Sequence, residues 1–143
     1  MISTVRVRRA DWMRDRDHLR YVRETVFVHE QQVPLEMEWD EQDEACVHVL
    51  ALDGDGAPIG TGRLLPDGHI GRMAVLPGWR GQGVGGALLT ELVQIARERG
   101  FSEALLNAQV QAIAFYTRHG FAAEGPEFLE AGIPHQTMRR QLI

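Results

Sequence analysis

The segment GWRGQGVGGALL, residues 78–89, constrains the fold of this chain more than any other stretch. Four glycines fall within six residues at the start of an apolar helix, where each costs up to about 1 kcal/mol relative to alanine. A simple strand-to-helix turn does not need so many. Glycines let a backbone approach a ligand closely, and the N–H groups at a helix start bind phosphate. The segment therefore predicts an anion-binding turn between a strand and a helix.

Two phosphate-binding patterns fit the same segment: G-x-G-x-x-G at Gly81, Gly83 and Gly86, and R-x-x-G-x-G at Arg80, Gly83 and Gly85. The first pattern normally follows the first strand of a βαβ unit and needs an acidic residue after the second strand. In this chain a helix and three strands come first. Glu103 lies near the required distance, but it begins the next strand instead of following it. The context therefore favours the second pattern, with Arg80 as a fixed positive charge.

Composition narrows the class of protein. The 143 residues, 44 % of them hydrophobic, suit one domain over residues 1–143 with a sizeable core. The net charge of −5, with no basic run that contains interleaved aromatic residues, argues against nucleic acid as a partner. No apolar run approaches the ~20 residues of a membrane span, and the charged start MISTVRVRRADW is unlike a signal peptide. We therefore expect a cytoplasmic protein that makes no membrane contact.

Individual residue types exclude specific chemistry. The 15 basic residues are all arginine, and the absence of lysine excludes a Walker A phosphate loop and Schiff-base catalysis. The single cysteine, Cys46, cannot form an internal disulfide, which fits a reducing compartment. Its apolar surroundings, CVHVLAL, predict a buried structural thiol. The six histidines show no metal-ligand spacing, so no metal site is expected.

Hydrophobic periodicity and turn residues predict a mixed α/β domain with the order β-α-β-β-β-α-β-α-β-β. Helices are expected over 83–99 and 111–120, and each ends at a glycine. The second, third and fourth strands form an antiparallel meander around DGDG and PDG turns. The expected strands are 3–9, 46–52, 58–65, 69–76, 102–109, 121–128 and 135–143.

The N-terminal half contains one further helix and an acidic segment. Asp15 or Asp17 can cap this helix, whose apolar positions keep helical spacing: Leu19, Val22, Val26 and Phe27. Pro34 breaks the helix. The following stretch, QQVPLEMEWDEQDEA, is acidic and irregular, and it fits either a lid or a solvated loop.

Two segments within residues 69–121 resemble one protein family. IGRMAVLPGWRGQGVGGALL resembles the acetyl-CoA motif of the GNAT N-acetyltransferase superfamily, and LLNAQVQAIAFYTRHGF resembles its companion motif. VFVHEQQVP, EWDEQD and GPEFLEAGIPHQTM resemble the small bacterial ElaA-like branch, which extends the likeness over nearly the whole chain. The resemblance implies an acyl-CoA N-acyltransferase fold in which two parallel strands, 69–76 and 102–108, splay apart to admit the cofactor.

The resemblance also assigns cofactor contacts. The backbone of three residues would pair with the pantetheine arm like an extra strand: Met73, Ala74 and Val75. The glycine turn would hold the pyrophosphate: Arg80, Gly81, Gln82, Gly83, Val84, Gly85 and Gly86. Asn107 would bind the pantetheine from the second strand. Ala112 and Phe115 would line the cofactor wall.

Few groups are needed for the chemistry that the resemblance implies. Tyr116 occupies the general-acid position and would protonate the departing thiolate, because a phenol has a pKa near that of a thiol. An N–H near Val75 could stabilise the oxyanion. Glu30, at the end of the first helix, could take the amine proton directly or through water, although an exposed helix-end charge fits it equally well. His135 and His48 are alternative bases.

The implied function is transfer of the acetyl group of acetyl-CoA to an amine by direct attack in a ternary complex. An acyl-CoA sensor of the same fold without turnover is the alternative, and a nucleotide-dependent oxidoreductase fails on topology. The net negative charge favours a small cationic amine as acceptor, and a protein lysine is the alternative. Asp40 and Asp43 could attract such an amine, although a solvated acidic loop is the simpler interpretation. Dimers are common in the family, so a homodimer is an open expectation.

Overall fold

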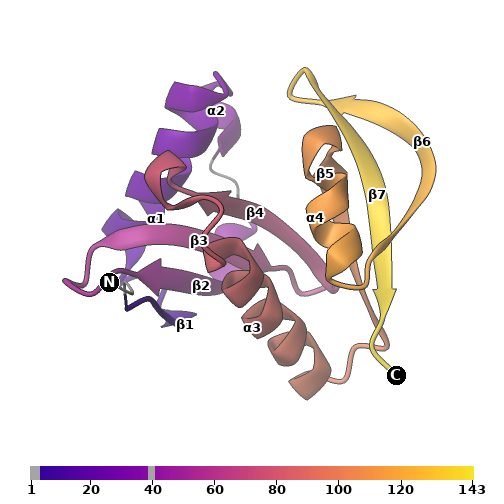
Figure 1. Cartoon of the computed structure of the whole chain (residues 1–143), viewed down its shortest axis with the longest axis horizontal. Helices are drawn as coiled ribbons and strands as arrows, with labels where there is room; N and C mark the ends of the chain where they lie inside the picture. Colours follow the sequence, from indigo (N-terminus) through magenta and orange to yellow (C-terminus); the bar gives the residue numbers. More distant parts are fainter. Residues whose placement is uncertain (1–3, 39–40) are drawn as a thin grey trace.

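The computed structural model describes residues 4–38 and 41–143 (Figure 1). One sheet runs through it, in the order β1-β2-β3-β4-β5-β7-β6, and only β4 and β5 are parallel neighbours. The expected strands are confirmed with their ends shifted by a few residues. Their bounds are β1 (Arg6–Ala10), β2 (Val47–Leu52), β3 (Pro58–Leu64), β4 (His69–Val75), β5 (Glu103–Gln109), β6 (Ala122–Glu130) and β7 (Ile133–Gln141).

Helices cover both faces of the sheet. On β2, Val49 and Ala51 join the core cluster that contains α3, whereas Leu50 and Leu52 pack with Leu19 of α1. This alternation shows that the central strands are buried on both sides. No helix in the described part of the chain is long and apolar enough to cross a membrane. The helices are α1 (Arg16–Arg23), η1 (Glu24–Glu30), α2 (Leu35–Glu38), η2 (Asp43–Ala45), η3 (Pro77–Trp79), α3 (Val84–Glu98), η4 (Val110–Ala112) and α4 (Ile113–Arg118).

The parallel pair β4–β5 is held together at one end only. Its register contains two residue pairs, His69 with Leu105 and Ile70 with Leu106. Beyond them the two strands diverge, and the sheet divides into a β1–β4 half and a β5–β7–β6 half (Figure 1). The expected divergence of these strands is therefore confirmed. The region between β4 and β5 beyond the pair Ile70–Leu106 is called the splay.

A bulge lies on β4 directly after the paired end. Thr61 of β3 pairs with Ala74, whereas Arg63 pairs with Gly71, so β4 contains one extra residue. Arg72 in the bulge has φ 50°, a backbone conformation that side chains other than glycine rarely adopt. The bulge bends β4 where it leaves β5.

The first helix differs from the expectation in its second half. The apolar positions are buried as predicted, but residues 24–30 wind as the π-helix η1, in which Gln31 N–H bonds to the carbonyl of Val26, five residues back. Asp15 stands at the N-cap, yet its carboxylate accepts from Arg8 and from the Asp11 N–H instead of from the helix. Val26 of η1 packs with Ala74 of β4 in one buried cluster.

In the acidic segment 31–45, the described residues 31–38 and 41–45 contain more secondary structure than expected. It contains α2 and η2, which the predicted element order lacked, and it buries Glu38 and Asp43 at 1 % exposure each. The prediction that Asp43 belongs to a solvated loop or attracts an amine is therefore wrong, because buried arginines bind it. Asp40 lies outside the described residues. Cys46 is half-buried at the start of β2, so it is less enclosed than the predicted structural thiol.

Candidate active site

The glycine turn presents a cluster of unbonded N–H groups. Gly81 and Gly83 have φ of 76° and 85°, and α3 begins directly afterwards at Val84. The first backbone hydrogen bond of this helix runs from Ala87 N–H to the Gly83 carbonyl. Among the residues that the structure describes, no carbonyl accepts from the N–H groups of residues 81–86. These donors lie at the positive end of the dipole of a 15-residue helix, which suits a phosphate group.

Gly85 and Gly86 let α3 and α4 pack closely, because they have no side chain. A Cβ on Gly85 would lie 3.4 Å from the ring of Phe115, and one on Gly86 would lie 3.2 Å from the ring of His119. Side chains at these positions would push α4 away from the start of α3. The same Cβ on Gly85 would lie 3.8 Å from Val75. The end of β4, the start of α3 and Phe115 of α4 therefore meet at the open end of the splay.

Arg80 and Glu30 form a bidentate ion pair beside this turn. Arg80 Nη1 and Nη2 each donate to one Glu30 carboxylate oxygen over 2.7 Å, and Nε donates to the Val75 carbonyl over 3.0 Å. The hydrogen bonds and charge of Arg80 outweigh partial burial and lower the pKa of the Glu30 carboxyl. The structure thus joins the residue expected to hold pyrophosphate to the residue expected to act as base.

Gln31, the next residue along the chain, contacts the other arm of the splay. Its side-chain amide exchanges two hydrogen bonds with that of Gln109 at the end of β5, over 2.8 and 3.3 Å. Gln111 also donates to Gln109. Gln31 and Gln109 were not predicted from the sequence. The only signal for Gln31 is that it follows Glu30, and the only signal for Gln109 is that it ends a strand with alternating burial. The end of η1 therefore contacts both diverging strands.

Tyr116 on α4 is 9 % exposed and lies edge-on to Phe115 and Phe121. Within the described residues its hydroxyl forms no hydrogen bond. Burial raises the pKa of the Tyr116 phenol to about 12, above the value of about 8.5 for an ordinary thiol. The Tyr116 phenol is therefore a weaker acid than an ordinary thiol.

Asn107 and His135 are placed on the face of the β5–β7–β6 half away from the main core. Asn107 accepts a hydrogen bond of 3.0 Å from Thr137, its register partner on β7. His135 is paired in register with Gln109 and is 6 % exposed. Its Nδ1 donates to the Ile133 carbonyl over 2.6 Å, and its Nε2 lies 3.5 Å from Glu130. Both residues are thus engaged within the sheet.

His48, the other alternative base, lies far from solvent. It is 1 % exposed, it stacks on Trp12, and its Nε2 donates to the Asp43 carbonyl over 2.8 Å. Burial lowers the pKa of His48, so the imidazole is neutral. These contacts place His48 beside Asp43 and Trp12 and not between the diverging strands β4 and β5.

Known proteins share this architecture. The sequence matches the profile of the acetyltransferase (GNAT) domain over residues 15–142. The chain belongs to the GNAT acetyltransferase family. It is 44 % identical over 124 residues to the Bacillus subtilis (strain 168) protein named Uncharacterized N-acetyltransferase YjcF, covering 84 % of this chain and 88 % of that protein.

Crystal structures of other GNAT proteins agree in fold. An acyl-CoA N-acyltransferase from Pseudomonas aeruginosa superposes with a TM-score of 0.82 at 31 % identity, covering 97 % of this chain and 99 % of that one. Escherichia coli ElaA superposes with a TM-score of 0.85 at 25 % identity, covering 96 % and 100 %. The GNAT assignment makes the protein an acyl-CoA-dependent acetyltransferase, which transfers an acyl group to an amine.

The residues present fit an acyl-CoA molecule. An extended pantetheine arm needs free backbone groups along a strand, and in the described part of the chain no strand pairs with β4 beyond Ile70 on its β5 side. A pyrophosphate needs clustered donors, and the turn at 81–86 supplies them. Ala112 and Phe115 are partly buried against the core between these two features. The splay and the glycine turn therefore form one continuous candidate site for acyl-CoA.

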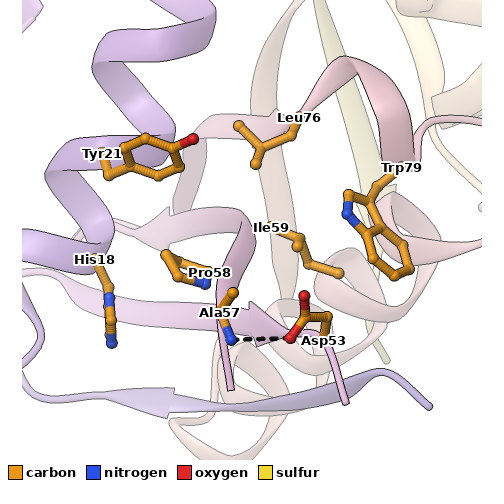
Figure 2. A pocket seen from close by; sticks show the side chains of 8 residues that line it. All are labelled: His18, Tyr21, Asp53, Ala57, Pro58, Ile59, Leu76 and Trp79. Carbon is orange, nitrogen blue, oxygen red and sulfur yellow. Dashed lines mark hydrogen bonds between the residues drawn. The ribbon is translucent and has the colours of Figure 1, made fainter. Parts of the chain in front are cut away.

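A separate hollow of about 470 Å³ lies between α1 and the ends of β3 and β4. Figure 2 shows Tyr21 and Trp79 on opposite sides of it, with Leu76 between them. Asp53 at its rim accepts from the Ala57 N–H over 2.9 Å. None of the residues expected to contact the cofactor lines this hollow. Its lining is His18, Tyr21, Asp53, Ala57, Pro58, Ile59, Leu76 and Trp79.

Proposed function

We propose that this protein is an N-acetyltransferase that moves the acetyl group of acetyl-CoA to an amine by direct attack in a ternary complex. The observation that carries the proposal is the divergence of β4 and β5 after two residue pairs, toward the unbonded N–H groups at the start of α3. Coenzyme A has an extended pantetheine arm with a pyrophosphate at one end, which matches an unpaired strand edge that leads to a cluster of N–H groups. Membership of the GNAT family supports the same reaction.

Cofactor binding is assigned to the open arm of β4 and the glycine turn. The backbone of Met73–Val75 would pair with the pantetheine amides, since β5 leaves that edge free. Arg80 and the N–H groups of Gly81–Gly86, with Gln82 and Val84 between the glycines, would bind the pyrophosphate. Ala112 and Phe115 would pack against the arm. Asn107 would contribute from β5 once its amide turns from Thr137.

Tyr116 is proposed as the general acid. The amine nitrogen attacks the thioester carbon, the C–N bond forms, and an N–H near Val75 stabilises the oxyanion. The C–S bond then breaks, and the sulfur takes the Tyr116 proton, so that coenzyme A leaves as a thiol. Burial raises the pKa of this phenol to about 12, so Tyr116 keeps its proton near neutral pH. The same low-dielectric surroundings raise the basicity of the thiolate, which narrows the difference in pKa between donor and acceptor.

The base is proposed to be Glu30, acting directly or through water on the amine proton. A carboxylate held by an arginine is a weak base, because the ion pair stabilises its charged form. Glu30 can therefore accept a proton efficiently only after it separates from Arg80. His135 is the alternative, since its Nδ1 proton is held by the Ile133 carbonyl and a neutral ring then keeps a lone pair on Nε2. A small cationic amine is the proposed acceptor, in keeping with the net charge of −5.

Acetyl transfer to a panel of amines, with mass detection of the products, tests this proposal. We expect one or more primary amines to gain an acetyl group at a rate that depends on acetyl-CoA. Tyr116→Phe should abolish most of that rate while leaving coenzyme A affinity unchanged. Coenzyme A binding without transfer to any amine, in the wild type, would instead support an acyl-CoA sensor.

A further inference from the structure

The last turn of η1 bridges the open end of the splay. Glu30 reaches the β4 arm through Arg80, which itself binds the Val75 carbonyl. Gln31 reaches the β5 arm through Gln109. Two consecutive residues thus contact both strands between which the pantetheine arm is proposed to lie. A carboxylate is therefore fixed beside the proposed place of the pantetheine arm.

In this arrangement the Arg80 guanidinium has no free bidentate edge. The edge formed by its two terminal nitrogens holds both oxygens of Glu30, and its Nε is bonded to the Val75 carbonyl. A phosphate group binds arginine best through two parallel hydrogen bonds. Arg80 can therefore bind a pyrophosphate in this manner only if Glu30 leaves.

The ion pair is open enough to exchange. The side chains of Arg80 and Glu30 are 42 % and 39 % exposed, and ion pairs exposed to this degree contribute little net stability. A pyrophosphate carries more negative charge than one carboxylate, and the adjacent N–H groups of residues 81–86 add donors that Glu30 does not use. The anion of the cofactor should therefore displace the anion of the protein.

We propose that Glu30 and the pyrophosphate of acetyl-CoA compete for the Arg80 guanidinium, so that cofactor binding releases the Glu30 carboxylate to receive a cationic amine. This inference rests on the proposed function, since it takes the glycine turn as the pyrophosphate site. It specifies the substrate class, because only a positively charged acceptor gains from the released carboxylate. Linkage requires the reverse effect as well: an amine bound to Glu30 frees Arg80 and tightens cofactor binding.

Calorimetric titration with coenzyme A on four variants tests the exchange. Glu30→Gln removes the competing charge, so it should bind coenzyme A about fivefold more tightly than the wild type. Arg80→Gln should bind more weakly. In the double variant the gain from Glu30→Gln should disappear, because there is no guanidinium left to release. Glu36→Gln is the matched control: it removes the same charge from an exposed position on α2 and should leave the affinity unchanged.

Three results would overturn the proposal in distinguishable ways. Equal or weaker coenzyme A binding by folded Glu30→Gln would show that Glu30 merely orients Arg80. If Glu30→Gln still tightened coenzyme A binding in the Arg80→Gln background, the effect would come only from repulsion between the Glu30 carboxylate and the pyrophosphate, and not from competition for Arg80. Failure of the wild-type protein to bind coenzyme A would reject the proposed function itself, whatever the state of the Glu30–Arg80 pair.

Discussion

Arg23 and Asp43 form an ion pair of 2.9 Å in which both side chains are at most 2 % exposed. The same Asp43 oxygen accepts from Arg63 over 2.7 Å, and Arg23 Nε donates to Glu38 over 2.6 Å. Burial opposes ionisation of Asp43, but its bonds to the two arginines outweigh it and lower the pKa. For Glu38 burial prevails and raises the pKa. This network fixes α2 and η2 to α1 and β3, and thereby sets the path of the chain between η1 and the sheet.

Asp43→Asn should destabilise the fold strongly. It keeps the shape of the side chain but leaves Arg23 and Arg63 buried without their shared carboxylate. Removal of one partner from a buried ion pair typically costs about 3–5 kcal/mol. Urea unfolding measures this loss, and Glu44→Gln, a charge removed from the exposed neighbouring position, should change the free energy of unfolding by less than about 0.5 kcal/mol. A loss below 1 kcal/mol in Asp43→Asn would show that the network is dispensable.

Acid should weaken the fold partly through Asp15. Hydrogen bonds from Arg8 hold the pKa of Asp15 at about 2, below its usual 3.8. A lowered folded-state pKa means that this contribution is complete above about pH 5 and is lost as the pH falls through about 2. We expect about 1–2 kcal/mol, reduced by solvent because Arg8 is half-exposed.

Urea unfolding of Asp15→Asn at pH 6 and pH 2.5 checks this dependence. The variant should be less stable than the wild type at pH 6, and the difference should shrink to about a third of that value at pH 2.5. Asp17→Asn, an exposed neighbour, serves as the control and should follow the wild type at both values. A stability difference for Asp15→Asn that is the same at both pH values would contradict the assignment.

Tyr116→Phe should separate chemistry from binding. The change removes one oxygen and keeps the ring between Phe115 and Phe121, so the packing of α4 should survive. Single-turnover acetylation of the best amine should slow by roughly 10²–10⁴-fold, as is typical for a positioned general acid. In the wild type, deprotonation of Tyr116 should not reduce the rate below about pH 11, since its pKa is about 12. Equal rates for the variant and the wild type would identify solvent or another group as the acid.

Gly83→Ala should impair cofactor binding more than the fold. Its φ of 85° is unfavourable for alanine by roughly 1–2 kcal/mol. If the backbone relaxes to relieve that strain, the N–H groups of the glycine turn will change direction. We expect at least a tenfold loss of coenzyme A affinity, about 1.4 kcal/mol. Gly78→Ala is the control in the same loop, because its φ is ordinary and its added methyl meets open space. Unchanged affinity in folded Gly83→Ala would reject the pyrophosphate assignment.

Local sequence signals predicted the C-terminal half well. The start of α3 was found to within one residue, because Gly83 and the apolar spacing of the helix both mark it. The order of helices and strands along the chain followed from hydrophobic periodicity and turn residues, whereas the splay followed from the resemblance of residues 69–121 to a known family. The predicted turn is present, with positive φ at Gly81 and Gly83, whereas the packing role of Gly85 depends on Phe115, which only the folded chain brings near.

Long-range pairing explains what the sequence could not show. Acidic residues in a loop are usually solvated, and Asp43 is buried only because Arg23 and Arg63, each twenty residues away, converge on it. Glu30 and Arg80 are fifty residues apart, so no local pattern links them. The π-helical turn of η1 likewise depends on packing against β4 and has no periodicity of its own.

The two residue pairs between β4 and β5 also bear on how the molecule opens. Strands β5, β7 and β6 all lie within residues 103–141 and form an antiparallel three-stranded unit of their own, so this half can lose its ladders without breaking those of β1–β4. In hydrogen exchange we expect the halves to behave as two cooperative units, with amides of β5–β7–β6 exchanging together and at a rate distinct from β2 and β3. Helix α3 contacts strands on both sides of the junction. Its protection should therefore follow that of the slower unit.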